Sequence, residues 1–357
     1  MRRMDAKSLS IDEIESFFSG LGEPRFRARQ VVNWLFVKGA DNFDQMTNLP
    51  LGLRARLAEL LTITVPVIAA KRSTDGGLTV KYLFQLTDGE KIETVLMHRP
   101  WGRTVCVSSQ VGCRMGCRFC ASGKGGLIRN LSPGELYDQV LFIQKDTGLR
   151  PSHIVLMGTG EPFDNLDNTL RFLRTITHPA SIGIGARHIT LSTCGVVPGI
   201  HALAELGLQV GLAVSIHAPN DRLRDRLVPV NRRYPLRSLI GACREFCGKT
   251  GRRVTFEYTL IAGENDGAGE ARELAELLKG LSCHVNLIPL NRVTDRRFEA
   301  TPPERVKLFK KILEKEGLVV TTRREVGGGI AAACGQLRCN YREPRLMVPK
   351  SDCRKPI

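Results

Sequence analysis

The chain has 357 residues, of which 42% are hydrophobic and 25% are charged, and its formal net charge is +16. This composition predicts about two globular domains and excludes both a disordered chain and a membrane span, because the longest nearly apolar stretch, residues 62–70, is short and interrupted by Thr and Pro. The N-terminus has no apolar segment of the kind that directs secretion, so we expect a cytoplasmic protein.

The N-terminal part of the chain is predicted to form short helices joined by turns. Residues 10–13 open one helix, residues 26–37 place apolar side chains at helical spacing, and residues 51–61 form a third helix. The pattern indicates a small helical domain.

A β-hairpin is predicted next. The segments 79–86 and 91–98 alternate apolar and polar side chains around Asp88-Gly89, a pair that tolerates positive φ in a tight turn. Glu93 lies on the second strand of this hairpin, where it could simply face solvent.

From residue 103 onward, strand and helix patterns alternate. The predicted strands are residues 104–108, 153–157, 188–192, 210–216, 254–260, 284–288 and 318–322. Such alternation predicts an α/β fold with right-handed crossovers and a parallel sheet, and six or seven units fit a partial or complete (β/α) barrel whose functional groups lie at the carboxyl ends of its strands. The predicted parts are a helical domain (1–75), a hairpin connector carrying Glu93 (76–100), a barrel core (101–345) and a basic tail (346–357).

The positive charge lies mainly outside the helical domain. Residues 1–70 carry nine basic and eight acidic side chains, whereas residues 221–253 carry ten basic and three acidic ones. The arginines in this basic segment include Arg222, Arg224, Arg226, Arg232, Arg233, Arg252 and Arg253. Together they predict a surface that faces phosphates, although a solvated helix face accounts for any one of them alone.

Eleven cysteines in an intracellular chain indicate metal binding or thiol chemistry rather than structural disulfides. Cys113, Cys117 and Cys120 follow the first predicted barrel strand with the spacing C-x3-C-x2-C. Three thiolates suit a [4Fe-4S] cluster that leaves one iron open to an outside ligand, whereas a structural zinc needs a fourth ligand, for which Cys106 is available. The spacing resembles that of the radical S-adenosylmethionine superfamily, in which S-adenosylmethionine binds the open iron.

Polar residues follow three further predicted strands. Residues 157–162, Met-Gly-Thr-Gly-Glu-Pro, contain glycines that permit close backbone approach to a ligand, and a carboxylate suited to an ammonium group. Phe163 excludes a dinucleotide-binding motif, which requires a third glycine at that position. Single polar groups are also ordinary at strand ends. The candidate cofactor-binding residues are Gly160, Glu161, Ser192, Ser215, Ile216 and His217.

Four segments together resemble the radical-SAM ribosomal RNA adenine methyltransferases: residues 106–113, the GTGEP loop, residues 285–291 and residues 332–337. The resemblance covers nearly the whole chain and implies that the helical domain binds RNA. It implies methylation of carbon 2 of an adenine in 23S rRNA and of an adenine next to the tRNA anticodon. It also implies a monomer with one [4Fe-4S] cluster on three cysteines, two S-adenosylmethionine molecules per turnover, and an electron donor such as flavodoxin or ferredoxin.

The resemblance further implies roles for individual residues. Cys334 takes a methyl group from one S-adenosylmethionine and becomes the methyl carrier. A radical made from the second S-adenosylmethionine activates that methyl group, which adds to the adenine, and Cys106 then frees the RNA by forming a disulfide with Cys334. Glu93 matches the base that removes the ring proton, and Asn291 would contact the nucleoside or orient Cys334.

Alternatives remain open at this point. A sister branch of the family methylates carbon 8, and Gly329 and Ala331 stand where family members often have acidic residues. A non-catalytic RNA-binding protein could instead hold zinc with Cys106 and the three motif cysteines, and a radical enzyme could act on a small molecule.

Overall fold

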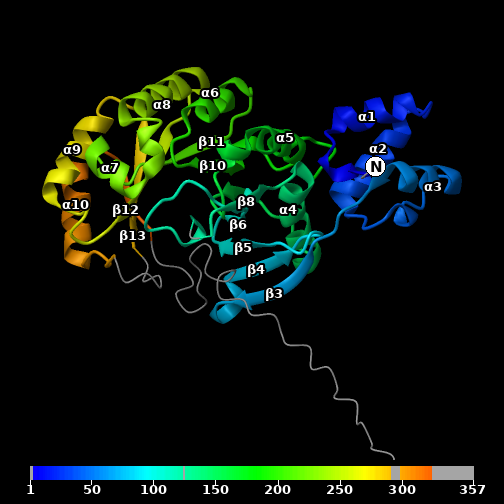
Figure 1. Ribbon diagram of the computed structural model, residues 1–357, viewed down its shortest axis with the longest axis horizontal. Helices are drawn as coiled ribbons and strands as arrows, with labels where there is room; N and C mark the ends of the chain where they lie inside the picture. The colour runs from blue at the N-terminus through cyan, green and yellow to red at the C-terminus, as the bar shows by residue number, and fades with distance from the viewer. Residues whose placement is uncertain (1–2, 124, 291–297, 324–357) are drawn as a thin grey trace, which may run out of the picture.

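The computed structural model describes residues 3–123, 125–290 and 298–323 (Figure 1). The three predicted N-terminal helices are confirmed as α1 (Ile11–Gly20), α2 (Arg25–Asn33) and α3 (Leu51–Leu60). Ser10 begins α1 with a reciprocal capping box, in which its hydroxyl accepts the N–H of Glu13 and the Glu13 carboxylate accepts the N–H of Ser10. A two-stranded parallel pair, β1 (Met4–Asp5) and β2 (Leu61–Thr62), closes this domain.

The predicted hairpin is confirmed as β4 (Thr79–Gln85) and β5 (Lys91–Arg99), with Gly89 at φ +89° in the turn. A third strand, β3 (Val67–Ser73), pairs antiparallel with β4. It lies within residues 1–75, which we predicted as helical. The sequence did not reveal β3 because most of its side chains are exposed, so no apolar alternation marks this edge strand.

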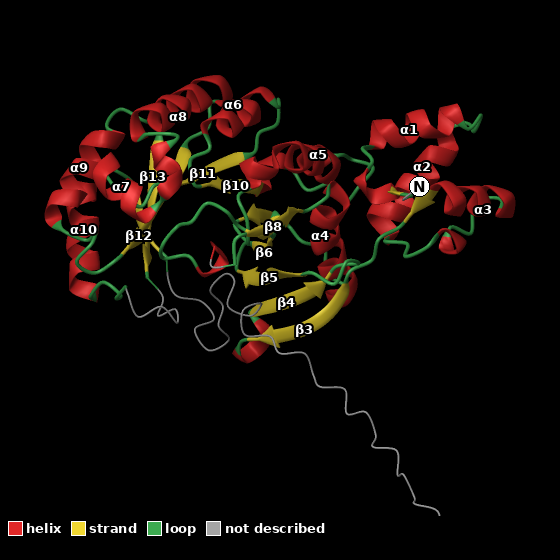
Figure 2. Ribbon diagram, in the orientation of Figure 1, coloured by secondary structure: helices red, strands yellow, loops and turns green. Residues whose placement is uncertain are grey.

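The antiparallel strands β3, β4 and β5 continue directly into the parallel strands. Together they form one mixed sheet of ten strands in the order β14-β13-β12-β11-β10-β9-β6-β5-β4-β3 (Figure 2). The seven predicted parallel strands are confirmed as β6 (Gly102–Cys106), β9 (His153–Leu156), β10 (Ile189–Thr193), β11 (Gly211–Ser215), β12 (Val254–Leu260), β13 (Cys283–Pro289) and β14 (Val320–Thr322). No pairing joins β14 to β3 within the described ranges, so this part of the chain forms a partial barrel.

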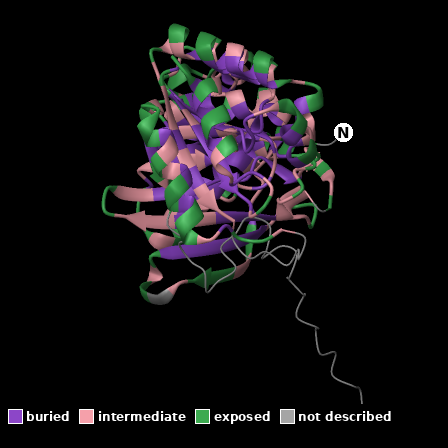
Figure 3. Cartoon of the chain, turned by 90° about the vertical axis from the view of Figure 1, so that its left-hand side faces the viewer, coloured by how far each residue is buried: buried purple, intermediate pink, exposed green. Residues whose placement is uncertain are grey.

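Helices cover one face of the parallel sheet and bury its apolar side chains (Figures 1 and 3). These helices are α4 (Pro133–Thr147), α5 (Leu166–Thr177), α6 (Val197–Glu205), α7 (Asp221–Leu227), α8 (Leu236–Thr250), α9 (Ala268–Leu278) and α10 (Pro303–Lys315). The buried core contains Ile154, Leu191 and Phe256 from the strands together with Leu141 and Leu274 from the helices. No helix in the three described ranges has the length and apolarity needed to cross a membrane.

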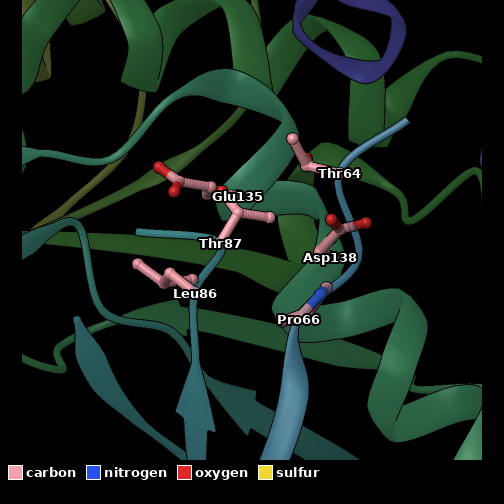
Figure 4. A pocket seen from close by; sticks show the side chains of 6 residues that line it. All are labelled: Thr64, Pro66, Leu86, Thr87, Glu135 and Asp138. Atoms are coloured by element: carbon pink, nitrogen blue, oxygen red, sulfur yellow. The ribbon is translucent and has the colours of Figure 1, made fainter. Parts of the chain in front are cut away.

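The helical domain is joined to α4 by a buried ion pair. Lys7 Nζ lies 2.6 and 2.7 Å from the two carboxylate oxygens of Asp138, and both side chains are almost fully buried. A small pocket lies at this junction, lined by Thr64, Pro66, Leu86, Thr87, Glu135 and Asp138 (Figure 4). None of the candidate site residues lines this pocket.

Candidate functional site

The face of the sheet opposite the helices carries the predicted polar residues. Paired residues in adjacent strands share a face, and side chains alternate along each strand. The register therefore places Glu93, Cys106, Ser192 and Ser215 on one face. The pairs that establish this are Val95–Cys106, Cys106–Val155, Val155–Thr190 and Ser192–Ala213.

The cysteine loop is held at both ends. It leaves β7 (Gln110–Gly112), which pairs with β8 (Leu127–Asn130), and the N–H of Cys113 donates to the carbonyl of Gly126 at 2.9 Å. In the middle of the loop, the N–H of Arg118 donates to the carbonyl of Leu227 at the end of α7. The loop is thus fixed between the β7–β8 ribbon and α7.

The three cysteine thiols share one small region. Burial, with a contribution from the neighbouring Cys120, raises the pKa of Cys113 to about 11. Burial also raises the pKa of Cys117, again with contributions from the other two thiols. Crowded thiolates require a cation, which binding to iron supplies.

The donor set fits an iron–sulfur cluster. Within the described residues, no three His, Cys, Asp or Glu side chains are arranged to hold a single metal ion. In a cluster each thiolate binds a different iron, so the three sulfurs need not surround one point. Cys113, Cys117 and Cys120 therefore suit a cluster with one iron open to an outside ligand.

The glycine-rich loop after β9 packs against the chain segment that follows β6. The carbonyl of Thr159 accepts the N–H groups of Ser109 and Gln110. A Cβ atom at Gly158 would lie 2.7 Å from the Ser108 nitrogen, and one at Gly160, which has φ +109°, would lie 2.6 Å from the Ser109 hydroxyl. In the structure these two glycines make room for the segment after β6, and the close approach of Gly160 to a ligand stays a prediction.

Glu161 connects the ends of β9 and β10. Its side chain is buried, and its two carboxylate oxygens accept the N–H groups of Cys194 at 2.7 Å and Phe163 at 3.1 Å. Burial raises its pKa, and these hydrogen bonds oppose the rise. Its negative charge also raises the pKa of Cys113 and Cys117, so the carboxylate lies close to the cysteine loop.

The segment after β11 has an unusual backbone at His217, which at φ +54° is the only described non-glycine residue with positive φ. Its Nδ1 accepts the N–H of Thr259 at 2.9 Å, and its ring packs edge-to-face on Phe119 of the cysteine loop, with centroids 4.8 Å apart. Burial, with a contribution from Arg224, lowers the pKa of His217 to about 3, so the ring is neutral at physiological pH. A neutral ring with Nδ1 as acceptor carries its proton on Nε2.

The Ile216 side chain is fully buried, and its backbone groups are both occupied. Its N–H donates to the carbonyl of Glu257, and its carbonyl accepts from Arg224. On the same face of the sheet as Ser215, Asn286 donates to the Glu257 carboxylate at 2.8 Å. Glu257 is paired with Ser215 in the register and adds a buried carboxylate that the sequence analysis did not single out.

Glu93 is only 4% exposed, so the alternative of a solvent-facing carboxylate is wrong. Its Oε2 lies 2.8 Å from Nζ of Lys81, which is fully buried on β4. The sequence analysis missed Lys81, because a lysine in an alternating strand is normally placed on the solvent side.

The prediction that Arg224 belongs to a phosphate-facing surface is wrong. Arg222, Arg226, Arg232 and Arg233 are exposed as expected, but Arg224 is fully buried. Its guanidinium donates to the carbonyls of Cys194, Ser215 and Ile216 and to the Asn231 side chain. The apolar residues around Arg224 on α7, Leu223 and Leu227, are the signal that it faces inward.

Several predictions fall on residues outside the described ranges. These are the roles of Asn291 and Cys334, the departures at Gly329 and Ala331, and the basic tail of residues 346–357.

A partial (β/α) barrel with a C-x3-C-x2-C loop after its first parallel strand defines a radical S-adenosylmethionine enzyme. Residues 107–278 match the radical SAM superfamily, whose members use S-adenosylmethionine and a [4Fe-4S] cluster. Residues 5–63 match the N-terminal domain of ribosomal RNA large subunit methyltransferases. The chain belongs to the family of RlmN-type dual-specificity radical SAM RNA methyltransferases, which confirms the predicted enzyme class and an RNA substrate.

The family assignment rests on relatives of nearly equal length. The chain is 56% identical to a probable dual-specificity RNA methyltransferase RlmN of Desulforamulus reducens over 95% of this chain and 97% of the relative. It is 57% identical to the protein of the same name from Pelotomaculum thermopropionicum over 94% and 92%. The crystal structure of a radical SAM methyltransferase from Sphaerobacter thermophilus matches with a TM-score of 0.88 and 49% identity, covering 93% of this chain and 98% of that one.

Proposed function

We propose that this enzyme methylates carbon 2 of an adenine in 23S rRNA and of an adenine next to the tRNA anticodon. The observation that carries the proposal is the placement of a buried carboxylate, Glu93, and a buried thiol, Cys106, on one face of the sheet. A ring carbon between two nitrogens is electrophilic, so direct transfer of a methyl cation to it is disfavoured. The reaction therefore needs a radical route, a thiol to release the product and a base to remove the ring proton.

Cys113, Cys117 and Cys120 would hold one cluster, which supplies the electron that cleaves S-adenosylmethionine. The proposed nucleoside site is formed by the strand ends around Glu161, Ser192 and Ser215–His217. The buried carboxylate of Glu161 would supply the negative charge that pairs with an ammonium group, beside its hydrogen bonds from Cys194 and Phe163. The neutral ring of His217 can donate from Nε2, while the buried Ile216 side chain contributes packing.

Two S-adenosylmethionine molecules are consumed in each proposed turnover. The thiol of Cys334 attacks the methyl carbon of the first and becomes S-methylcysteine, and S-adenosylhomocysteine leaves. The second yields a 5′-deoxyadenosyl radical that takes one hydrogen atom from the S-methyl group, and the resulting carbon radical adds to the adenine. The radical adduct would pass one electron back to the oxidised cluster as Glu93 removes the ring proton. Cys106 would then attack the sulfur of Cys334 and break its bond to the CH2 group, which would take up a proton to become the methyl group. The resulting Cys106–Cys334 disulfide would be reduced by an external thiol reductant before the next turnover.

Lys81 supports the assignment of Glu93 as the base. Its ammonium lies 2.8 Å from the Glu93 carboxylate in a nearly dry environment. The ion pair fixes the Glu93 carboxylate on the face of the sheet that carries Cys106. The electron donor is proposed to be a flavodoxin or a ferredoxin, and the enzyme is proposed to act as a monomer.

The experiment that tests the function is an anaerobic incubation of the iron-loaded protein with S-adenosylmethionine, a reductant and either a 23S rRNA fragment or tRNA. Modified nucleosides are identified by mass spectrometry against 2-methyladenosine and 8-methyladenosine standards. We expect 2-methyladenosine in both RNAs, its loss in Cys334→Ala, and a protein–RNA adduct in Cys106→Ala. Cys247→Ala, on the outer helix α8, is the matched cysteine control. A product of 8-methyladenosine would assign the enzyme to the sister branch.

A further inference from the structure

Arg224 is a buried cation that contacts no carboxylate among the described residues. Its side chain is 0% exposed, and its hydrogen bonds go to the carbonyls of Ile216 (3.0 Å), Cys194 (2.6 Å) and Ser215 (3.3 Å) and to the side-chain oxygen of Asn231 (2.8 Å). These acceptors are all neutral. The nearby carboxylates of Asp221 and Asp225 accept from the side-chain nitrogen of Asn231, so they are linked to the guanidinium only through that residue. Burying a charge without a counter-charge in direct contact is costly, and a negative group that approaches Arg224 from the other side would offset that cost.

The cysteine loop lies against the helix that carries Arg224. Cys117 packs against a buried apolar cluster that includes Leu223 and Leu227, the neighbours of Arg224 on α7, and the carbonyl of Leu227 accepts the N–H of Arg118. The guanidinium is thus close to the loop whose thiolates would carry the cluster.

A cluster on three thiolates is negatively charged, and its reduction adds a further negative charge. A buried cation nearby stabilises the reduced form more than the oxidised form, because Coulomb interactions are strong in a medium of low dielectric constant. The buried charge of Arg224 would therefore favour reduction of the cluster, a role that the exposed arginines of the same segment cannot fill.

We propose that Arg224 is the buried counter-charge of the cluster and a positioning residue that favours its reduction. This inference rests on the proposed assignment of the cluster to Cys113, Cys117 and Cys120. The same guanidinium ties the ends of β10 and β11 together through Cys194, Ser215 and Ile216. These hydrogen bonds require several N–H donors in a fixed plane, which arginine has and lysine lacks.

The test is the midpoint potential of the cluster in the full-length, anaerobically iron-loaded protein, followed by the electron paramagnetic resonance signal of the reduced form. Arg224→Gln should shift the midpoint to a more negative potential at unchanged iron content. The matched control is Arg226→Gln on the same helix, whose exposed guanidinium pairs with Glu264 and whose loss should leave the midpoint unchanged. A wild-type midpoint in a folded, fully loaded Arg224→Gln protein would overturn the inference.

Arg224→Lys keeps the test decisive if the glutamine variant fails to fold. Burial lowers the pKa of an amine, so raising the pH should neutralise the introduced side chain while the wild-type guanidinium stays charged. The midpoint of Arg224→Lys should therefore fall with pH relative to wild type, and parallel pH profiles would overturn the inference. The titratable groups that face this position are Cys117, Cys194, Asp221, Cys243 and His217. They are present in both proteins and cancel in the comparison.

The two proposals fail separately. If the wild-type protein binds no cluster, or binds one that survives substitution of the motif cysteines, the proposed function fails. If the wild type carries the cluster and only the Arg224 variants behave like wild type, this inference alone fails.

Discussion

Replacing Lys7 with methionine should strongly destabilise the junction between the helical domain and the barrel. Lys7 contacts both carboxylate oxygens of Asp138, and the two side chains are only 1% and 2% exposed. Removing one partner of a buried pair leaves an uncompensated charge and costs about 3–5 kcal/mol of unfolding free energy. The double variant Lys7→Met/Asp138→Leu removes both charges and should recover most of that loss.

The unfolding free energy of Lys7→Met should depend on pH with a defined sign. Burial raises the pKa of Asp138 from 3.8 to about 7, although the charge of Lys7 opposes the rise, so the pKa is higher still without Lys7. At pH values between 3.8 and the raised pKa of Asp138, the folded variant keeps a proton on Asp138 that the unfolded chain has released. The unfolding free energy of the variant therefore falls as the pH rises. At about 1.4 kcal/mol per pH unit, lowering the pH from about 7 to about 5.5 should restore about 2 kcal/mol.

The assay is urea-induced unfolding of the full chain at these two pH values. Lys145→Met is the matched control. Lys145 lies on α4, as Asp138 does, and pairs with Asp41 of the helical domain at 2.9 Å, but both of these side chains are substantially exposed. Exposed pairs contribute at most about 1 kcal/mol. The reasoning is refuted if Lys7→Met costs no more than this control, or if the unfolding free energy of Lys7→Met is the same at both pH values.

Three further predictions concern the site. Cys117→Ala should lose nearly all bound iron and the visible absorbance of the cluster, whereas Cys243→Ala in the core should keep both; iron retained by Cys117→Ala would contradict the ligand assignment. Lys81→Met should still cleave S-adenosylmethionine but slow RNA release by about 100-fold, the lower limit expected for a positioned base. Accumulated protein–RNA adduct on a denaturing gel measures this, and normal release would argue against Glu93 as the base. The lowered pKa of His217, about 3 against 6.5, means that stability is complete above about pH 6.5 and falls on acidification. Between about pH 6.5 and 5 this loss is about 2 kcal/mol in the iron-loaded wild type and should be absent in His217→Gln; an identical pH dependence in both proteins would contradict it.

Much of the fold follows from local patterns that the sequence carries by itself. The seven parallel strands lie where β-rich segments alternate with helical ones, and Gly89 turns the hairpin as its sequence predicts. The capping residues Ser10 and Glu13 begin α1 through contacts three residues apart. Such signals are readable because the interacting groups are close together in the chain. The cysteine spacing is equally local, and it indicated the enzyme class.

The tertiary structure decided which polar residues meet. Glu93 and Ser215 are 122 positions apart, and only the register of the intervening strands places them on one face of the sheet. Lys81 and Arg224 carry charged side chains, which are normally exposed, yet both are fully buried. Their burial depends on partners far along the chain, an acidic side chain for Lys81 and the carbonyls of two strand ends for Arg224. A charged side chain is exposed by default, and only partners assembled by folding can offset the free-energy cost of removing it from water.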